Sequence, residues 1–433
     1  MNTFGKLLGF DSSKTTVRTE LVAGVTTFLT MSYILAVNPA VLGTTGMDKA
    51  ALFSSTAIVS AIATLLLAFM AKLPFAQAPS VGLNAFFAFT LCQGMGLTWE
   101  QSLAVMLVEG ILFILITFFN VREIILECIP KNLRFAISAG IGMFIAFIGL
   151  KNAGIVVISP TTLVKLGSFT PVSILGIISI LLCGMLYIRK VKGALFYGIL
   201  LSTIIGIPMG VTLIPDGWMP VSAPHSLSPI FCKFDFSGFF TFKMLTVVFS
   251  LLLVNIFDTL GTLFALIHKT IAVRPESNSK NLKNAMLSDA IGTTCGAIFG
   301  CSTITTYIES ASGVAEGGRT GLTAFFVGML FLIALFLSPV FLLIPGAATS
   351  GPLVMVGVLM MDAFKQIDLD DVSEAFPSFI TIITMVLCCS IADGISLGIL
   401  SYVIIKVLSG KFKHLNAALY VLAVLFILNY AIG

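Results

Sequence analysis

Two carboxylic acids within long apolar stretches are the residues of this chain best suited to chemistry. Asp258 lies in Asn255-Ile-Phe-Asp-Thr-Leu-Gly-Thr262, and Glu309 lies in Gly300-Cys-Ser-Thr-Ile-Thr-Thr-Tyr-Ile-Glu-Ser310. An ionisable group at bilayer depth is energetically expensive, so it marks a functional site by default. A low-dielectric pocket disfavours the charged form of a carboxyl group, so either acid is able to exchange a proton or to accept an N–H hydrogen bond from a planar ligand. The alternative for each residue is a structural role, as a buried carboxylate bonded to neighbouring hydroxyls.

A third segment, Ala78-Pro-Ser-Val-Gly-Leu-Asn-Ala-Phe-Phe-Ala-Phe89, is too rich in helix-breaking residues to be an ordinary lipid-facing helix. Pro79 removes a backbone donor and disfavours helix at the residue before it. The pattern predicts an extended stretch followed by a half-helix that starts near Gly82. Residues 300–306 predict the same arrangement from the opposite side, so two half-helix N-termini would face one polar pocket. The alternative is two kinked helices whose hydroxyls bond back to their own carbonyls.

The pocket predicted from these segments suits a flat heterocycle, because it combines an aromatic face with polar groups for the ligand edge. Phe86 is the first candidate for the face, and Asn84 for the edge, although packing between helices would also explain a phenylalanine here. Glu109 also lies within a span, and we interpret it as a buried or paired acid remote from the pore. The predicted substrate-binding residues are Gly82, Asn84, Phe86, Asp258, Thr306 and Glu309, and the proton-coupling residues are Asp258 and Glu309.

The elements that must position these residues are membrane-spanning helices. The chain has 433 residues, of which 58% are hydrophobic and 10% charged, and its mean hydropathy is +1.07. Apolar runs of about 20 residues, the length of a helix that crosses a bilayer, recur from residue 21 to residue 432. No Cys or His cluster has metal-ligand spacing, and no phosphate-binding loop is present, so we expect no metal and no cofactor. The composition predicts an all-α polytopic membrane protein.

Fourteen predicted spans divide the chain into two halves with the same plan. They lie near residues 20–41, 51–71, 78–92, 101–120, 134–151, 173–188, 194–214, 243–267, 284–299, 303–314, 321–343, 349–363, 376–391 and 393–408. Seven spans per half turn the second half upside down, which makes an inverted repeat with broken third and tenth segments. The predicted divisions are an N-terminal segment at 1–20, a first repeat at 21–214, an outer connection at 215–242 and a second repeat at 243–433.

The distribution of basic residues predicts a cytoplasmic N-terminus. Alternating spans from that side leave only Lys49, Lys151, Lys165, Lys233 and Lys243 outside, which agrees with the positive-inside rule. The apolar segment 416–432 does not fit the plan. It is an extra span, an interfacial helix, or a sign that 376–408 is one long broken element.

The chain resembles the nucleobase transporters of the NCS2 superfamily, in the AzgA-like branch of adenine, guanine and hypoxanthine permeases. The resemblance covers nearly the whole chain, and four segments carry it: residues 16–31, Gly82-Leu-Asn-Ala-Phe-Phe-Ala-Phe89, Phe257-Asp-Thr-Leu-Gly-Thr262, and residues 307–323 from Tyr307-Ile-Glu-Ser to Glu316-Gly-Gly-Arg-Thr. It implies a core domain, about 21–120 and 243–343, that moves against a gate domain, about 134–214 and 349–433. It also implies that Asp258 and Glu309 bind the base and couple protons, and that gate domains join homodimers.

Together these features predict a proton-coupled importer of purine bases in the plasma membrane, with no nucleic-acid partner and no enzymatic activity. The segment around Gly82 favours adenine weakly. An anion carrier is the first alternative, but two carboxylates would repel its substrate. A membrane-embedded enzyme is the second, and the chain shows neither a nucleophile–base set nor metal ligands.

Overall fold

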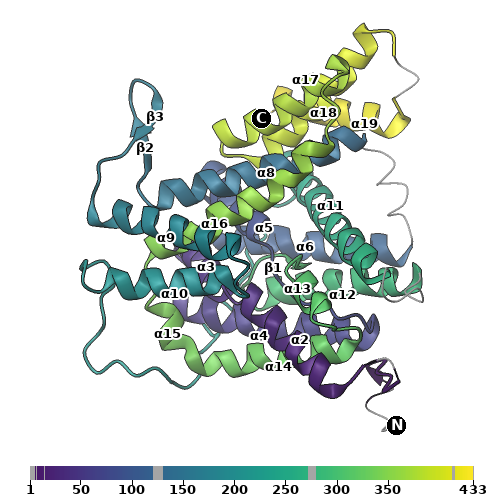
Figure 1. Ribbon diagram of the computed structural model, residues 1–433. Coiled ribbons are helices and arrows are strands. Elements are labelled where there is room, and N and C mark those ends of the chain that lie inside the picture. Colours follow the sequence, from purple (N-terminus) through teal and green to yellow (C-terminus); the bar gives the residue numbers. More distant parts are fainter. Residues whose placement is uncertain are drawn as a thin grey trace.

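The computed structural model describes residues 5, 7–13, 15–119, 130–271, 279–411 and 415–432. Residues 1–4 of the predicted N-terminal segment and the predicted inner loops at 120–129 and 272–278 lie outside this part. The described chain is helical apart from two small pairs of strands (Figure 1). The α-helices are α2 (Val17–Met31), α3 (Ile34–Leu42), α4 (Lys49–Met70), α5 (Val81–Ala85), α6 (Trp99–Phe118), α8 (Lys131–Asn152), α9 (Pro171–Ile188), α10 (Ala194–Gly206), α11 (Phe242–Ile271), α12 (Ser279–Ile298), α13 (Ser310–Ala315), α14 (Gly321–Ala334), α15 (Ser338–Leu342), α16 (Gly346–Met360), α17 (Val372–Leu387), α18 (Ile391–Leu408) and α19 (Ala417–Ile432). The other elements are the strands β1 (Gln77–Pro79), β2 (Val156–Ser159), β3 (Leu163–Leu166) and β4 (Ile304–Thr306), the π-helix η2 (Phe86–Gly94), and the 3₁₀ turns η1 (Gly43–Thr45), η3 (Leu335–Leu337) and η4 (Met361–Gln366).

The described part of the chain holds 8 helices that are long and apolar enough to cross a membrane. Four shorter apolar helices accompany them, at Val81–Gly94, Ala194–Gly206, Met244–Ile256 and Val372–Leu387. Predicted and observed elements agree closely along most of the chain, so the polytopic helical class is confirmed. The division into fourteen segments and two inverted repeats stays a prediction.

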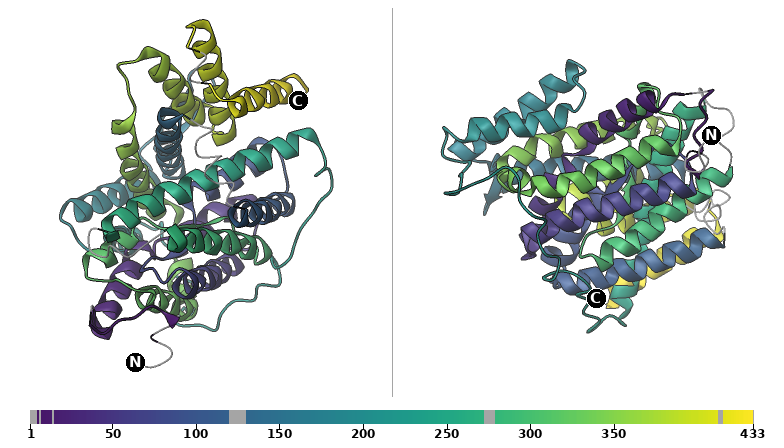
Figure 2. Two further views of the ribbon diagram at one scale, coloured as in Figure 1. Left: turned by 90° about the vertical axis from the view of Figure 1, so that its right-hand side faces the viewer. Right: turned by 90° about the horizontal axis from the view of Figure 1, so that it is seen from below.

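The helices pack in two groups. In the first group, α2 and α4 pack against α14, and α12 packs against α4 and α6. In the second group, α16 packs against α8 and α9, while α17 packs against α8 and α18. Seen from below, α2, α4 and α14 run side by side (Figure 2).

Glycines allow the helices of both groups to pack at a short distance from one another. A Cβ added to Gly110 of α6 would lie 2.8 Å from the Thr294 hydroxyl of α12. A Cβ at Gly142 of α8 would lie 2.6 Å from the Cβ of Met360 on α16. Close contact through glycines is a common packing mode for membrane helices, because burial of apolar surface gives little drive where the solvent is lipid.

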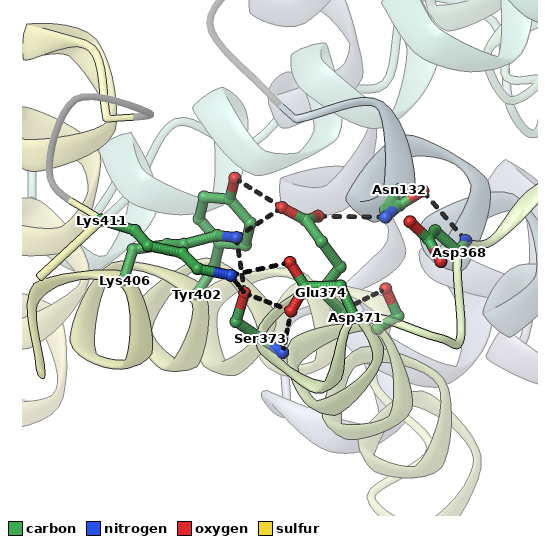
Figure 3. A network of polar contacts seen from close by, with 9 residues as sticks. Asn132, Asp368, Asp371, Ser373, Glu374, Tyr402, Lys406 and Lys411 are labelled. Atoms are coloured by element: carbon green, nitrogen blue, oxygen red, sulfur yellow. Dashed lines mark hydrogen bonds and ion pairs between the residues drawn. The ribbon is translucent and has the colours of Figure 1, made fainter. Parts of the chain in front are cut away.

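An ion-pair network joins the ends of three helices in the second group (Figure 3). Lys406 of α18 is only 2% exposed, and its ammonium lies 2.7 Å from the Glu374 carboxylate of α17. The same carboxylate accepts hydrogen bonds from the Tyr402 hydroxyl at 3.2 Å and from the Asn132 amide of α8 at 3.1 Å. A buried ion pair needs such extra bonds, because removing both charges from water is costly. The network therefore fixes α8, α17 and α18 to one another.

The C-terminal apolar segment forms the separate helix α19, so the last of its three sequence-based interpretations is wrong. Helices α17 and α18 are distinct, with a break between Leu387 and Ile391. α19 packs on α18 and on α11, and the Tyr430 hydroxyl donates to the Asp393 carboxylate of α18 at 3.0 Å. It is an addition to the second group rather than the end of a long broken element.

Candidate functional site

The two segments with broken helical patterns meet as a short antiparallel strand pair inside the helix bundle. β1 pairs with β4, with Gln77 opposite Thr306 and Pro79 opposite Ile304. Two further bonds extend the pair at its ends: Ser80 N–H donates to the Thr303 carbonyl at 3.0 Å, and Tyr307 N–H donates to the Ala76 carbonyl at 2.9 Å. The backbone groups freed by the breaks in the two helices are thus paired with each other, as burial requires. The alternative of two kinked helices is excluded.

Each strand leads directly into a half-helix, as the sequence predicts. α5 begins at Val81, one residue before the predicted start near Gly82, and continues as a nine-residue π-helix. α13 begins at Ser310, on the other side of the strand pair. π-Helical turns are rare and occur often at functional sites, because they displace side chains from the α-helical register.

The two N-cap residues direct their side chains away from their own helices. Neither Ser80 nor Glu309 makes a side-chain capping bond. Ser80 instead donates its hydroxyl to Oδ2 of Asp258 on α11 at 3.0 Å. Glu309 accepts the hydroxyl of Tyr33 at Oε1, at 2.9 Å. Both carboxylates therefore border the strand pair, and each is held by a hydroxyl from a different element.

Asp258 and Glu309 retain partial exposure, whereas the groups that hold them are buried. Ser80 is 6% exposed and Tyr33 is 2% exposed, while both acids are half-buried. An ionised carboxylate offers about four acceptor sites, so one hydrogen bond leaves most of its capacity free. Asp258 also lies near enough to Glu309 for their charges to repel each other. Both carboxylates can therefore accept N–H hydrogen bonds from a ligand.

The tyrosines complete one wall of this site. The rings of Tyr33 and Tyr307 lie with their centroids 6.4 Å apart, and the Tyr307 hydroxyl donates to the Pro79 carbonyl at 2.5 Å. This bond occupies the carbonyl of a residue that itself has no N–H to contribute to the strand pair. Neither tyrosine was predicted to have a role, although Tyr307 lies two residues before Glu309 in the sequence.

The other predicted site residues take buried positions around the first half-helix. Asn84 is fully buried, its Oδ1 accepts the Ser302 hydroxyl, and its amide nitrogen has no partner among the described residues. Phe86 is also fully buried. Gly82 faces the second helix group, because a Cβ there would lie 2.9 Å from Cγ2 of Ile141 on α8. Asn84 and Phe86 are thus buried in the first broken segment, and Gly82 lies against α8.

A polar network centred on Asp289 lies behind the strand pair, and it was not predicted from the sequence. Thr306, a predicted site residue, donates its hydroxyl to Oδ1 of Asp289 at 2.9 Å. The Gln77 amide donates to the same oxygen, and Oδ2 of Asp289 has no partner among the described residues. Charge repulsion from Asp258 also reaches Asp289. The available signals were a further acid within a predicted span and a glutamine directly before the segment Ala78–Phe89.

Glu109 has a polar partner that the sequence did not reveal. It is fully buried on α6, and its Oε1 accepts the Asn255 amide of α11 at 2.8 Å. Asn255 lies one turn before Asp258 and Thr259, and positions three and four apart share one face of a helix. Glu109 is therefore a paired buried acid, as interpreted, and it ties α6 to the helix that carries Asp258.

Metal binding has no support in the described residues, where no group of three or more His, Cys, Asp or Glu side chains could hold an ion. The described side chains around the strand pair are carboxylates, hydroxyls, an amide and aromatic rings.

Two broken segments that cross as a strand pair within a helical membrane protein define a transporter fold, and solved structures share it. The transmembrane domain of the cyanobacterial bicarbonate transporter BicA superposes with a TM-score of 0.62 at 19% identity, covering 87% of this chain and 97% of BicA. The murine anion transporter Slc26a9 in its inward-facing state gives a TM-score of 0.63 at 12% identity, covering 92% of this chain and 68% of the other. At these identities the likeness concerns the fold alone.

Residues 18–397 match the Xan_ur_permease model of the Permease family, and the chain belongs to this family, the NCS2 transporters. It is 41% identical to the adenine permease AdeP of Escherichia coli over 416 residues, which cover 96% of this chain and 93% of AdeP. It is 38% identical to the guanine/hypoxanthine permease PbuO of Bacillus subtilis over 424 residues, covering 96% and 98%. The resemblance found in the sequence is confirmed. The prediction that the chain is a multi-pass membrane transport protein rather than an enzyme is confirmed as well.

Proposed function

We propose that this chain imports purine nucleobases, namely adenine, guanine or hypoxanthine, by proton symport. The observation that carries the proposal is the pair of partly exposed carboxylates, Asp258 and Glu309, beside the pairing of the two broken segments. Relatives named adenine permease and guanine/hypoxanthine permease, alike over nearly their full length, support this substrate class.

A purine presents N–H donors on its edge and a flat apolar face. Asp258 and Glu309 accept the edge donors, and each such bond to a charged acceptor contributes about 1.5–3 kcal/mol. The proposed site also includes three residues that support its structure: Asn84, Phe86 and Thr306. Asn84 and Phe86 shape the half-helix below the carboxylates, and Thr306 holds the strand pair through Asp289. Gly82 lets this half-helix approach α8 closely.

Proton coupling follows from the crowding of acids. Asp258 lies close enough to both Glu309 and Asp289 for mutual repulsion, within a bundle of apolar helices. Like charges in a poorly solvated site do not all remain ionised, so at least one acid holds a proton during part of the cycle. Asp258 is the proton-responsive member in our proposal, because its hydroxyl partner Ser80 can bond to either protonation state.

The fold supports a division into a moving and a fixed part. The helices of the first group lie within the proposed core domain, about 21–120 and 243–343. The elements of the site pack on this group: α11, which carries Asp258, packs on α6, α13 packs on α2, and β1 packs on α4. The second group coincides with the proposed gate domain, about 134–214 and 349–433. We further propose fourteen membrane segments in two inverted repeats, with α19 as an addition. The N-terminus is cytoplasmic, the location is the plasma membrane, and gate domains join two copies.

The anion carriers that share the fold suggest a competing substrate class. Their sequences are less than 20% identical to this chain. An anion would also have to approach two acids that repel each other and would repel it. The acids thus favour a neutral, N–H-bearing ligand.

Uptake by whole cells tests the proposal. Cells that lack their own purine permeases and express this chain receive labelled adenine, guanine, hypoxanthine, uracil and sulfate, each with and without a protonophore. We expect accumulation of at least one purine, faster at lower external pH and abolished by the protonophore. Preferential uptake of uracil or sulfate would refute the substrate class, and accumulation that survives the protonophore would refute proton coupling.

A further inference from the structure

The strand pair β2–β3 forms a hairpin between α8 and α9 that stands clear of the helices (Figure 1). Val156 lies opposite Leu166, and Ile158 lies opposite Val164. Successive side chains of a strand point to opposite faces, so these four apolar residues share one face of the hairpin. The opposite face carries Val157, Ser159, Leu163 and Lys165. The hairpin is therefore two-sided, with one face entirely apolar and the other mixed.

The side chains of the apolar face are exposed to an unusual degree. Ile158 is 80% exposed, Leu166 is 68% exposed and Val164 is 42% exposed after packing against the rest of the described chain. Leu163, at the turn, is 79% exposed and has a φ of 64°, a left-handed conformation that is unfavourable for a leucine. An isolated two-stranded hairpin is marginal in water, so exposure of this kind calls for a partner outside the chain.

We propose that this hairpin lies in the headgroup layer of the membrane, with its apolar face against the lipid chains. A hairpin has two open edges, and unpaired backbone groups of a strand edge do not enter the hydrocarbon region. Its apolar face, conversely, is poorly suited to bulk water. The boundary layer satisfies both demands, as it does for amphipathic helices that lie flat on a bilayer.

The position of the hairpin along the chain fixes its depth. β2 begins at Val156, four residues after the end of α8 at Asn152, and β3 ends at Leu166, five residues before α9 begins at Pro171. Both neighbouring helices are candidate membrane spans. The hairpin therefore joins two helices at the membrane surface and has no length of chain with which to rise far above it.

Exposed apolar side chains also follow the hairpin along the chain, before and within α9. Phe169, just before this helix, is 70% exposed, and Val172 and Leu181 of α9 are exposed as well. Exposed apolar side chains on a spanning helix face lipid. The same lipid that covers α9 thus extends to the hairpin.

A second copy of the chain is a poorer occupant for this face. Strands of four residues, about 13 Å long and about 5 Å apart, present a face on the order of 100 Å². A stable protein interface buries about 800 Å² on each partner. The hairpin alone is too small for that, whereas a lipid surface has no such minimum area.

Tryptophan fluorescence in liposomes tests the placement without reference to any substrate, so its failure is distinct from failure of the transport proposal. The chain has two tryptophans, and the double substitution Trp99→Phe and Trp218→Phe removes their fluorescence. Val164→Trp reports on the apolar face, and Lys165→Trp is the matched control on the opposite face. Leu166→Trp is a second reporter on the apolar face, in case one variant folds poorly.

We expect brominated phosphatidylcholine to quench Val164→Trp at least about threefold more strongly than Lys165→Trp, with the reverse order for aqueous iodide. Equal quenching of both reporters by iodide, without quenching by lipid, would show that the hairpin lies in water and would overturn the proposal. Protection of Val164→Trp from both quenchers that is lost as the protein is diluted into more lipid would assign the face to a second copy, and would overturn it equally.

Discussion

Replacement of Glu309 by glutamine is the sharpest perturbation of the proposed site. The glutamine keeps the shape and keeps an oxygen for the Tyr33 hydroxyl, which donates to Glu309 at 2.9 Å. It removes the charge and the titrating proton. Because the Tyr33 bond survives, the half-helix that begins at Ser310 should remain in place, and the protein should reach the membrane in normal amounts.

The size of the effect follows from the bond that is lost. A hydrogen bond to an ionised acceptor contributes about 1.5–3 kcal/mol, so purine binding should weaken about ten- to a hundredfold. Concentrative uptake should disappear, because the variant has lost one of its two half-exposed acids. Binding of labelled purine to purified protein measures the first effect, and uptake by cells measures the second.

Glu316→Gln is the matched control for this variant. Glu316 lies seven residues further along the chain and pairs with Lys192 at 2.5 Å, away from the strand pair. Surface pairs of this kind contribute about 0–1 kcal/mol, so binding and uptake should stay near normal. If Glu309→Gln also retains near-normal binding, accumulation and pH dependence, Glu309 has no role in either substrate binding or coupling.

Four further predictions concern the rest of the site and the ion-pair network. Asp258→Asn should still bind or exchange purine but fail to concentrate it, and active accumulation by this variant would move the coupling role to Glu309. Asn84→Ala should change the ranking among adenine, guanine and hypoxanthine more than it changes expression; equal losses for all three would make Asn84 structural. Lys406→Ala should cost about 3–5 kcal/mol of stability, because it leaves Glu374 without its buried partner, whereas the matched surface variant Lys411→Ala should cost about 0–1 kcal/mol; equal melting temperatures would contradict this. The hydrogen bond from Lys411 holds the pKa of the Asp371 carboxyl well below its usual range. The ionised Asp371 therefore stabilises the folded protein above about pH 4, and this stabilisation is lost as the pH falls through the lowered pKa of the folded state. The melting-temperature difference between the protein and Asp371→Asn should shrink only in that acidic range.

The sequence predicts the broken segments well because their cause is local. Pro79 and the hydroxyl-rich run before Tyr307 cannot continue a helix, and the structure turns both into strands followed by half-helices. Helix positions are also local, since apolar runs of membrane length leave few alternatives. The two carboxylates were found for the same reason, as charged residues in apolar surroundings.

The partners of these acids could not be predicted, because they come from distant parts of the chain. Ser80 and Asp258 are 178 residues apart, and Tyr33 and Glu309 are 276 residues apart. Only the packing of the helix groups brings them together. A hydroxyl near an acid in space leaves no periodic signal in the sequence.

The burial of Asn84 and Phe86 could not be predicted from the sequence. Both were placed in the pocket from the composition of their segment, yet both are fully buried, on a segment that passes into a π-helix at Phe86. Asn84 lies in α5, and Phe86 is the first residue of the π-helix, whose occurrence the sequence did not reveal. The role of both residues stays a prediction that substitution will test.

Proton movement in proteoliposomes that contain only the purified protein tests the central claim most directly. A pH-sensitive dye inside the vesicles records acidification of the lumen after adenine, guanine or hypoxanthine is added outside. We predict that at least one purine acidifies the lumen at a rate that follows its own labelled uptake, that sulfate does not, and that Asp258→Asn abolishes the signal. Purine uptake without any acidification, or acidification unchanged in both Asp258→Asn and Glu309→Gln, would contradict the account.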